Sequence, residues 1–146
     1  SLPSYLSTIW KFSRPHTVIG SCLSILTLFA FVTPPQKLLT AQFLRALSFS
    51  MAPSLLMNLY ITGLNQLTDV EIDRINKPYL PLASGELSIA HGWQVVLVSL
   101  GLALVFAAKA AWPLRGVLLG SAALGTVYSL PPFRCDLYLL ACWTAS

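Results

Sequence analysis

Three oxygen-bearing side chains recur at four-residue intervals near the middle of the chain: Asn65, Asp69 and Asp73. On a helix they would lie one turn apart along one face. Two carboxylates at this spacing repel each other, more strongly where the dielectric constant is low, and a bound cation would relieve that repulsion. Oxygen ligands suit Mg²⁺, which typically combines one or two carboxylates with waters and substrate phosphate oxygens. We therefore predict a Mg²⁺ site that serves a phosphorylated substrate.

Basic side chains near this cluster favour a phosphate ligand. Arg74 and Lys77 follow the third oxygen residue, and Arg14 is expected at the same end of the molecule. Arginine binds phosphate in a bidentate manner, whereas lysine acts as a compact point charge. The alternative is a solvated loop whose mixed charges only keep it in water. Glu71 falls on another face of the helix and is expected to be solvated.

The composition indicates that lipid surrounds most of the chain. Of its 146 residues, 55% are hydrophobic and only 10% are charged, and the mean hydropathy is +0.71. Ordinary soluble domains carry about 25% charged residues. The nine basic and five acidic side chains are too few to cover a water-soluble core. We expect a lipid bilayer as partner and no nucleic acid, and protein partners stay open.

Four apolar stretches are long enough to cross a bilayer, which takes about 20 residues. They run over 16–33, 44–67, 90–108 and 115–132, and a fifth starts at 137 and is incomplete at 146. Backbone groups in lipid must be paired internally, and the alternating strands of a barrel are absent, so helices are predicted. We predict an all-α, multi-span transmembrane bundle, a single domain over 1–146 that is truncated at its C-terminus.

Four crossings bring every acidic residue to the side of the membrane that holds the N-terminus, here named side A. Its acidic residues are Asp69, Glu71, Asp73, Glu86 and Asp136. The opposite side, side B, receives only basic residues, namely Lys37, Arg45, Lys109 and Arg115. Acidic residues influence topology weakly, so their clustering indicates chemistry on side A.

Small residues in the later apolar stretches are expected to let helices approach closely. They are Gly101, Gly116, Gly120, Ser121 and Gly125. In membranes such residues commonly lie at helix–helix contacts. We interpret them as packing residues without a chemical role.

The oxygen-bearing segment closely resembles the N-x-x-x-D-x-x-x-D motif of the UbiA-type intramembrane prenyltransferases. Its residues 65–88 read NQLTDVEIDRINKPYLPLASGELS. Within that family, the amino-acid sequences of 65–66 and 76–85 are similar to those of the homogentisate prenyltransferases. The sequences of 12–26 and 125–134 are similar to them as well. The resemblance covers about residues 10–134, and the first apolar stretch is nearer to phytyl-transferring than to solanesyl-transferring members.

This resemblance implies roles for particular residues. The chain would be the N-terminal half of a UbiA-type fold. The catalytic and metal-binding residues would be Asn65, Asp69 and Asp73, which serve Mg²⁺ and the diphosphate. The diphosphate partners would be Arg74, Lys77 and Arg14.

The resemblance also implies the reaction. A prenyl group, expected to be phytyl, would pass from its diphosphate to homogentisate, which loses its carboxylate on the way to tocopherols. The protein would then lie in a plastid or cyanobacterial membrane. The alternatives are a homogentisate solanesyltransferase of plastoquinone synthesis and a non-catalytic transporter fragment whose acidic residues line an ion pathway.

Two further side chains are weaker candidates for substrate contact. His16 begins the first apolar stretch, where a lone histidine is more often a structural hydrogen-bonding residue than a base. Tyr128 lies near the side A end of the fourth stretch, where it either reaches the substrate or anchors the membrane interface.

Two features depart from the family's pattern. Its second aspartate-rich motif belongs to a later loop that this chain does not include, so the chain by itself is expected to be inactive. From Cys135 onward the amino-acid sequence also departs from that of the family.

Overall fold

The structure, a computed structural model, describes residues 2–130, with side chains from residue 5 onward. Within this range the chain forms helices and no strand, so the all-α prediction is confirmed. The long helices are α2 (Pro15–Val32), α3 (Ala41–Thr68), α6 (Ile89–Lys109) and α7 (Trp112–Ser129). The short elements are α1 (Leu2–Phe12), η1 (Pro35–Lys37), α4 (Val70–Asn76) and α5 (Pro81–Ser84).

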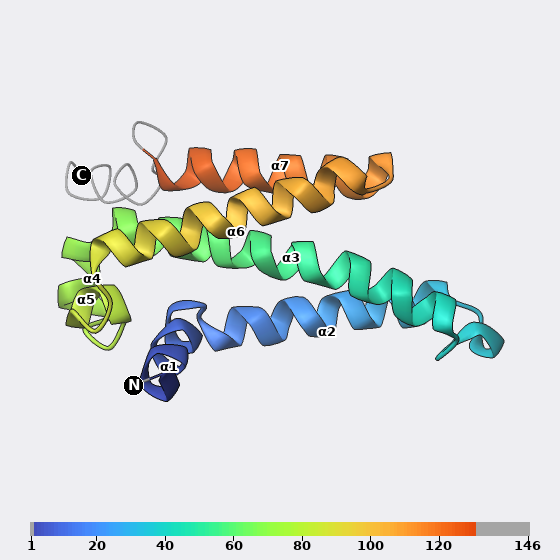
Figure 1. The fold of residues 1–146 in the computed structure, drawn as a ribbon, viewed down its shortest axis with the longest axis horizontal. Coiled ribbons are helices and arrows are strands. Elements are labelled where there is room, and N and C mark those ends of the chain that lie inside the picture. Colours follow the sequence, from blue (N-terminus) through green and yellow to red (C-terminus); the bar gives the residue numbers. More distant parts are fainter. Residues whose placement is uncertain (1, 131–146) are drawn as a thin grey trace, which may run out of the picture.

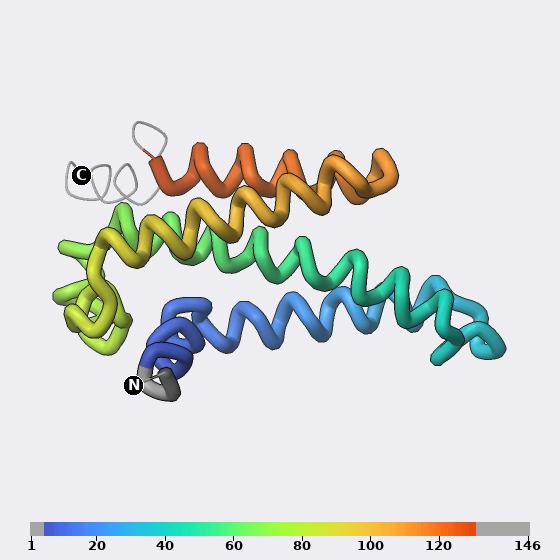
Figure 2. Tube along the Cα trace, viewed as in Figure 1, coloured from blue at the N-terminus to red at the C-terminus, as the bar shows by residue number. Residues whose placement is uncertain are grey.

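The long helices lie side by side and alternate in direction (Figure 1). α3 is central, because it packs against α2, α6 and α7. The elements α1, α4 and α5 gather at one end of the bundle, while η1 and the α6–α7 turn lie at the other (Figure 2). The first of these ends is side A, and it holds the motif residues.

Capping groups fix where the long helices begin and end. The hydroxyl oxygens of Thr40 and Ser88 accept hydrogen bonds of 3.3 Å from backbone N–H groups at the starts of α3 and α6. Pro15 occupies the first turn of α2, where its missing N–H costs nothing. Arg115 donates to the carbonyls of Ala107 and Ala110, at 3.1 Å each, and so closes the end of α6.

Three of the long helices have the length and composition to cross a membrane. They are α2, α3 and α6, with mean hydropathies of 1.7, 1.2 and 1.9. α7 also has 18 residues but is not among them, because Trp112, Pro113 and Arg115 make its first turn polar. Within residues 2–130, three of the predicted spans therefore coincide with candidate membrane helices, and α7 covers most of the fourth. The predicted fifth stretch, 137–146, and residues 131–132 of the fourth lie outside the described residues.

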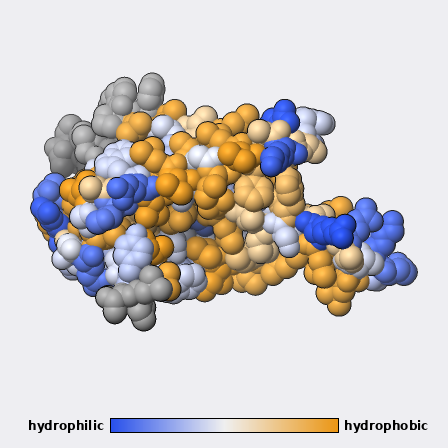
Figure 3. Space-filling model, in the orientation of Figure 1, coloured by the Kyte–Doolittle hydropathy of each residue, from blue (hydrophilic) through white to orange (hydrophobic). Residues whose placement is uncertain are grey.

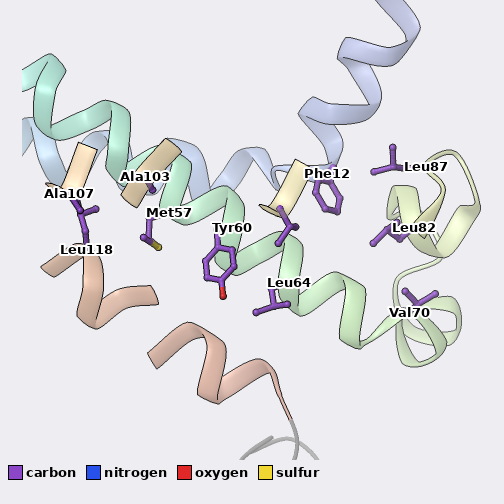
Figure 4. Packing of buried hydrophobic residues seen from close by; sticks show 11 residues of the cluster. Phe12, Met57, Tyr60, Leu64, Val70, Leu82, Leu87, Ala103, Ala107 and Leu118 are labelled. Atoms are coloured by element: carbon purple, nitrogen blue, oxygen red, sulfur yellow. The ribbon is translucent and has the colours of Figure 1, made fainter. Parts of the chain in front are cut away.

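The helix α1 is absent from the sequence prediction, because its 11 residues are too few to cross a bilayer. It lies across the end of the bundle rather than along it (Figure 1). Its last residue, Phe12, is fully buried and belongs to one hydrophobic cluster with Leu82 and Leu87 of the α5 region (Figure 4). Burial of this aromatic ring holds α1 and α5 together at side A.

Of the four glycines expected at helix contacts, one lies at a close contact. A Cβ on Gly125 would lie 2.6 Å from Cγ1 of Ile61, so α7 and α3 approach closely there, as predicted. Gly101, Gly116 and Gly120 do not meet the same expectation, because no described atom apart from their chain neighbours and their own helix backbone lies within 4 Å of the added Cβ. These three positions face open space because the neighbouring helices pass elsewhere.

Candidate active site

The three oxygen-bearing residues span the junction of two helices. Asn65 lies in the last turn of α3, Asp69 lies between α3 and α4, and Asp73 lies in α4. The backbone N–H of Asp69 donates to the Asn65 carbonyl at 3.0 Å, and that of Asp73 donates to the Asp69 carbonyl at 2.8 Å. The predicted spacing of one turn is therefore present. The prediction of one continuous helix face is corrected, because the helix breaks at Asp69 (φ −107°, ψ 12°).

Both carboxylates are buried despite their charge. Asp69 is 8% exposed and Asp73 is 3% exposed. The Asn65 amide Nδ2 donates to Oδ2 of Asp69 at 3.1 Å, and Lys77 Nζ lies 3.2 Å from Oδ1 of Asp73. Burying a carboxylate is costly unless it is paired and hydrogen-bonded. These contacts offset that cost and hold the two acids in fixed positions.

The donor set of the motif suits a hard divalent ion. It offers two carboxylates and one amide oxygen, all of them oxygen ligands, from Asp69, Asp73 and Asn65. Over residues 2–130 no group of three or more His, Cys, Asp or Glu side chains is arranged for a metal. An ion at this motif would therefore have to complete its shell with water or substrate oxygens.

The three predicted phosphate partners lie in different surroundings. Lys77 contacts the motif directly through Asp73. Arg74 instead pairs with Glu71 at 2.9 Å on the exposed side of α4, and Glu71 is solvated as expected. Arg14 belongs to the corner between α1 and α2, where it lines a separate pocket. Of these three basic residues, Lys77 is the one that pairs with a motif carboxylate.

A pocket of about 470 Å³ lies where the α1–α2 corner meets the loop after α4. Arg14 and His16 line one wall, and Pro78, Tyr79 and Leu80 line another. Arg14 has φ 54°, a left-handed conformation uncommon for a side chain of this size. No motif residue lines the pocket, but Pro78 in its wall directly follows Lys77, which is paired with Asp73.

Gln66, which the sequence interpretation did not single out, joins this corner to α3. Its side chain is 1% exposed, and Nε2 donates to the carbonyls of Phe12 at 2.8 Å and Thr62 at 3.2 Å. The Phe12 carbonyl ends α1, and Asn65 precedes Gln66 in the chain. Gln66 therefore fixes the corner against the motif. The available signal was an amide within an apolar helix, which must find partners.

Asn58 forms a second polar contact inside the bundle, also missed from sequence. Its Nδ2 donates to the Thr17 carbonyl at 3.0 Å and to Oγ of Ser21 at 2.9 Å. A groove of about 390 Å³ runs here between α2, α3 and α7. A polar residue inside a membrane segment is rare, and that rarity was its signal.

Tyr128, the aromatic residue predicted as a weaker candidate for substrate contact, lies on the outer surface of the bundle. Tyr128 is 45% exposed and lies near the side A end of α7. The tyrosine that reaches between helices is Tyr60, whose hydroxyl donates to Oγ1 of Thr126 at 2.6 Å, since Thr126 itself donates to the Ala122 carbonyl. His16 is exposed at the mouth of the corner pocket.

Comparison with known proteins decides the family. The model of the UbiA prenyltransferase family matches residues 20–142. The chain belongs to the UbiA prenyltransferase family. The resemblance seen in the motif is thereby confirmed, and the helical bundle with its membrane-length helices agrees with it. No solved structure matches the chain significantly.

Several curated members of the family are similar to this chain. The homogentisate phytyltransferase 1 of Arabidopsis thaliana is 43% identical over 129 residues, which is 86% of this chain and 32% of that protein. The homogentisate phytyltransferase of Synechocystis is 43% identical over 136 residues, or 88% of this chain and 42% of that protein. The homogentisate solanesyltransferase of Arabidopsis thaliana is 38% identical over 95 residues, or 64% of this chain and 24% of that protein. The chain thus spans less than half the length of these relatives.

Proposed function

We propose that the protein containing this chain transfers a prenyl group, in particular phytyl, from its diphosphate to homogentisate. The observation that supports this most strongly is the motif of Asn65 with the buried Asp69 and Asp73 at the end of a membrane-length helix in a UbiA family chain. The phytyl-transferring relatives align over 86% and 88% of the chain, against 64% for the solanesyl-transferring one. This difference favours phytyl over the solanesyl alternative.

Asp69 and Asp73, with the amide oxygen of Asn65, are the residues proposed to hold Mg²⁺ together with the diphosphate. When bound, the ion would neutralise charge that develops on the diphosphate. Lys77, already at Asp73, is positioned to stabilise the same charge as the allylic C–O bond breaks. Arg74 can join it by exchanging its exposed partner Glu71 for phosphate, since exposed ion pairs contribute little.

The bundle contributes by keeping water away. An allylic carbocation reacts with water, so its capture by the electron-rich ring of homogentisate requires a dry site. The groove beside Asn58 extends along α3 towards the motif, and its wall combines hydroxyl groups with apolar side chains such as Met57 and Leu118. We assign this groove to the start of the prenyl chain, with the rest of the chain in the bilayer.

The names of the relatives support a location in the membranes of plastids or cyanobacteria. One is called chloroplastic, and another comes from Synechocystis. Three membrane-length helices agree with an integral membrane protein. We propose this location for the protein that contains this chain.

Labelled phytyl diphosphate distinguishes an enzyme from a transporter. We expect the protein in sealed vesicles to bind the label only when Mg²⁺ is present, and to form prenylated product when homogentisate is added. Chelation should abolish both signals. Passage of the label into the vesicle lumen without any product would instead support the transporter alternative.

A further inference from the structure

The pocket at the α1–α2 corner contains a cation that is left without a partner. Arg14 is half-buried, and its guanidinium makes no hydrogen bond or ion pair with any residue that the structure describes. The neighbouring cation, Lys11, is already paired: its Nζ donates to Oε2 of Glu86 at 3.0 Å and to Oε1 at 3.2 Å. An unpaired guanidinium in a pocket favours an anionic ligand, which it can bind in a bidentate manner.

The charge of the pocket determines which anion fits. Its charged wall residues are Lys11, Arg14 and Glu86, two positive and one negative, which leaves one net positive charge. A diphosphate carries several negative charges and would need more free cations than this. A monocarboxylate carries one negative charge and matches the single free guanidinium.

The uncharged part of the wall fits a ring. Pro15, Pro78, Tyr79 and Leu80 give the pocket apolar and aromatic surfaces, and its volume is about 470 Å³. Sites for small molecules are commonly a few hundred Å³, mainly apolar, with a few polar groups that fix orientation. Tyr79 and His16 add polar groups for ring hydroxyls.

We propose that this pocket binds the acceptor of the proposed reaction, an aromatic monocarboxylic acid, with its carboxylate on Arg14. The inference rests on the proposed function. It reassigns Arg14, which the sequence placed with the diphosphate, to the second substrate. The pocket is connected to the motif in two ways. Pro78 in its wall follows Lys77, which pairs with Asp73, and Phe12, two residues before Arg14, accepts a hydrogen bond from Gln66, the neighbour of Asn65. An acid held here would therefore lie at the same end of the bundle as the motif.

Binding of two ring compounds to the protein in lipid nanodiscs tests this assignment. The probes are homogentisate and 2-methylhydroquinone, which keeps the ring and hydroxyls but lacks the carboxylate. The unmodified protein should prefer homogentisate by about tenfold or more, which is the range for a charge-assisted bidentate contact. Arg14→Gln should remove that preference without changing the affinity for 2-methylhydroquinone. The matched control is Arg45→Gln, an exposed arginine at the side B end of α3, which should retain the preference.

A second variant acts in the opposite direction. Glu86→Gln frees Lys11 and raises the net charge of the pocket, so homogentisate should bind several-fold more tightly. Both residues are partly exposed, so this variant does not depend on rebuilding a core. If Arg14→Gln fails to fold, Glu86→Gln decides alone: tighter homogentisate binding supports the assignment, and unchanged or weaker binding overturns it.

Mg²⁺-dependent binding of phytyl diphosphate, measured in the same samples, separates this inference from the proposed function. It should be unchanged in Arg14→Gln. Loss of diphosphate binding with unchanged homogentisate binding would return Arg14 to the diphosphate site and overturn the inference. Absence of diphosphate binding in the unmodified protein would count against the proposed function, whereas an Arg14-dependent preference for the acid would still support the pocket.

Discussion

At the scale of single residues, the motif combines burial with charge in a way that stability alone does not require. Asp73 is almost fully buried, yet its partner Lys77 is part-exposed. Replacing a buried ion pair with apolar residues often leaves a protein equally stable or more stable. The paired carboxylates are therefore better explained by the ligand they would bind than by the fold.

Neutralising either carboxylate should abolish the chemistry while the fold persists. In the complete protein, we expect Asp69→Asn or Asp73→Asn to lower prenyl transfer by about a hundredfold or more, because each variant removes charge that would hold the ion and diphosphate. Rates of product formation at saturating Mg²⁺ measure the effect. Glu71→Gln, the same change on the exposed side of α4, is the control. Full activity in both motif variants would disprove their assigned role.

We expect the Gln66 hydrogen bond to hold the α1–α2 corner in place against α3 and the motif. Gln66→Ala leaves the buried Phe12 carbonyl without its donor, which typically costs about 1–3 kcal/mol. We expect a lower unfolding midpoint in detergent and faster hydrogen exchange over residues 9–14. Gln94→Ala, at an exposed position of α6, should change neither. Equal effects of the two variants would refute a positioning role for Gln66.

At the scale of elements, α3 connects every part of the candidate site. It supplies Asn58 to the groove, Gln66 to the corner and Asn65 to the motif. Each of these side chains bonds to a different neighbour, so the position of α3 sets the relative placement of the groove, the corner and the motif. The close packing of α3 against α6 is thus part of the site as well as of the core.

A glycine on α3 tests that packing. A Cβ on Gly63 would lie 2.6 Å from Cγ2 of Val96 and 2.9 Å from Cζ of Phe12. We expect Gly63→Ala to lower the free energy of unfolding by about 1–3 kcal/mol, which is the usual cost of overpacking. Gly101→Ala, where nothing lies within 4 Å, should be neutral or stabilising by up to about 1 kcal/mol, since alanine favours helix. Unfolding in a detergent series measures both, and destabilisation by Gly101→Ala alone would contradict the described contacts.

At the scale of the whole molecule, a broad apolar band separates two polar ends. Figure 3 shows hydrophobic surface along the middle of the bundle and hydrophilic residues at both ends. Large apolar side chains of the long helices, such as Phe31, Val117 and Leu124, are 90%, 65% and 73% exposed. Water does not tolerate such a surface, whereas lipid does. The motif and the corner pocket then lie together at one membrane interface.

This arrangement predicts from which side each end can be reached. In a variant with Cys22, Cys135 and Cys142 replaced by serine, single cysteines at Asn76 and Gln36 should react with an impermeant maleimide from opposite sides of sealed vesicles of uniform orientation. Asn76 is exposed at the end of α4, and Gln36 is exposed in η1. Labelling of both positions before the vesicles are opened would contradict the two-sided arrangement.

The sequence by itself determined the helices, the motif and its side of the membrane. Apolar length is enough to predict membrane helices, because lipid forces the backbone to pair within each segment. A four-residue period is enough to place Asn65, Asp69 and Asp73 one turn apart, because local backbone geometry fixes that distance. The short helix α1 and the break at Asp69 were not predicted from the sequence, since neither has a long apolar run or a periodicity of its own.

Only the tertiary structure decided which charged groups meet. The pairs Lys77–Asp73 and Arg74–Glu71 are local, at i,i+4 and i,i+3, whereas other partners are far apart in the sequence. Gln66 bonds to a residue 54 positions away, and Lys11 bonds to one 75 positions away. Such partners depend on how α1, α3 and the α4–α5 region pack in space. For that reason the unpaired Arg14 and its pocket became visible only when these elements were brought together.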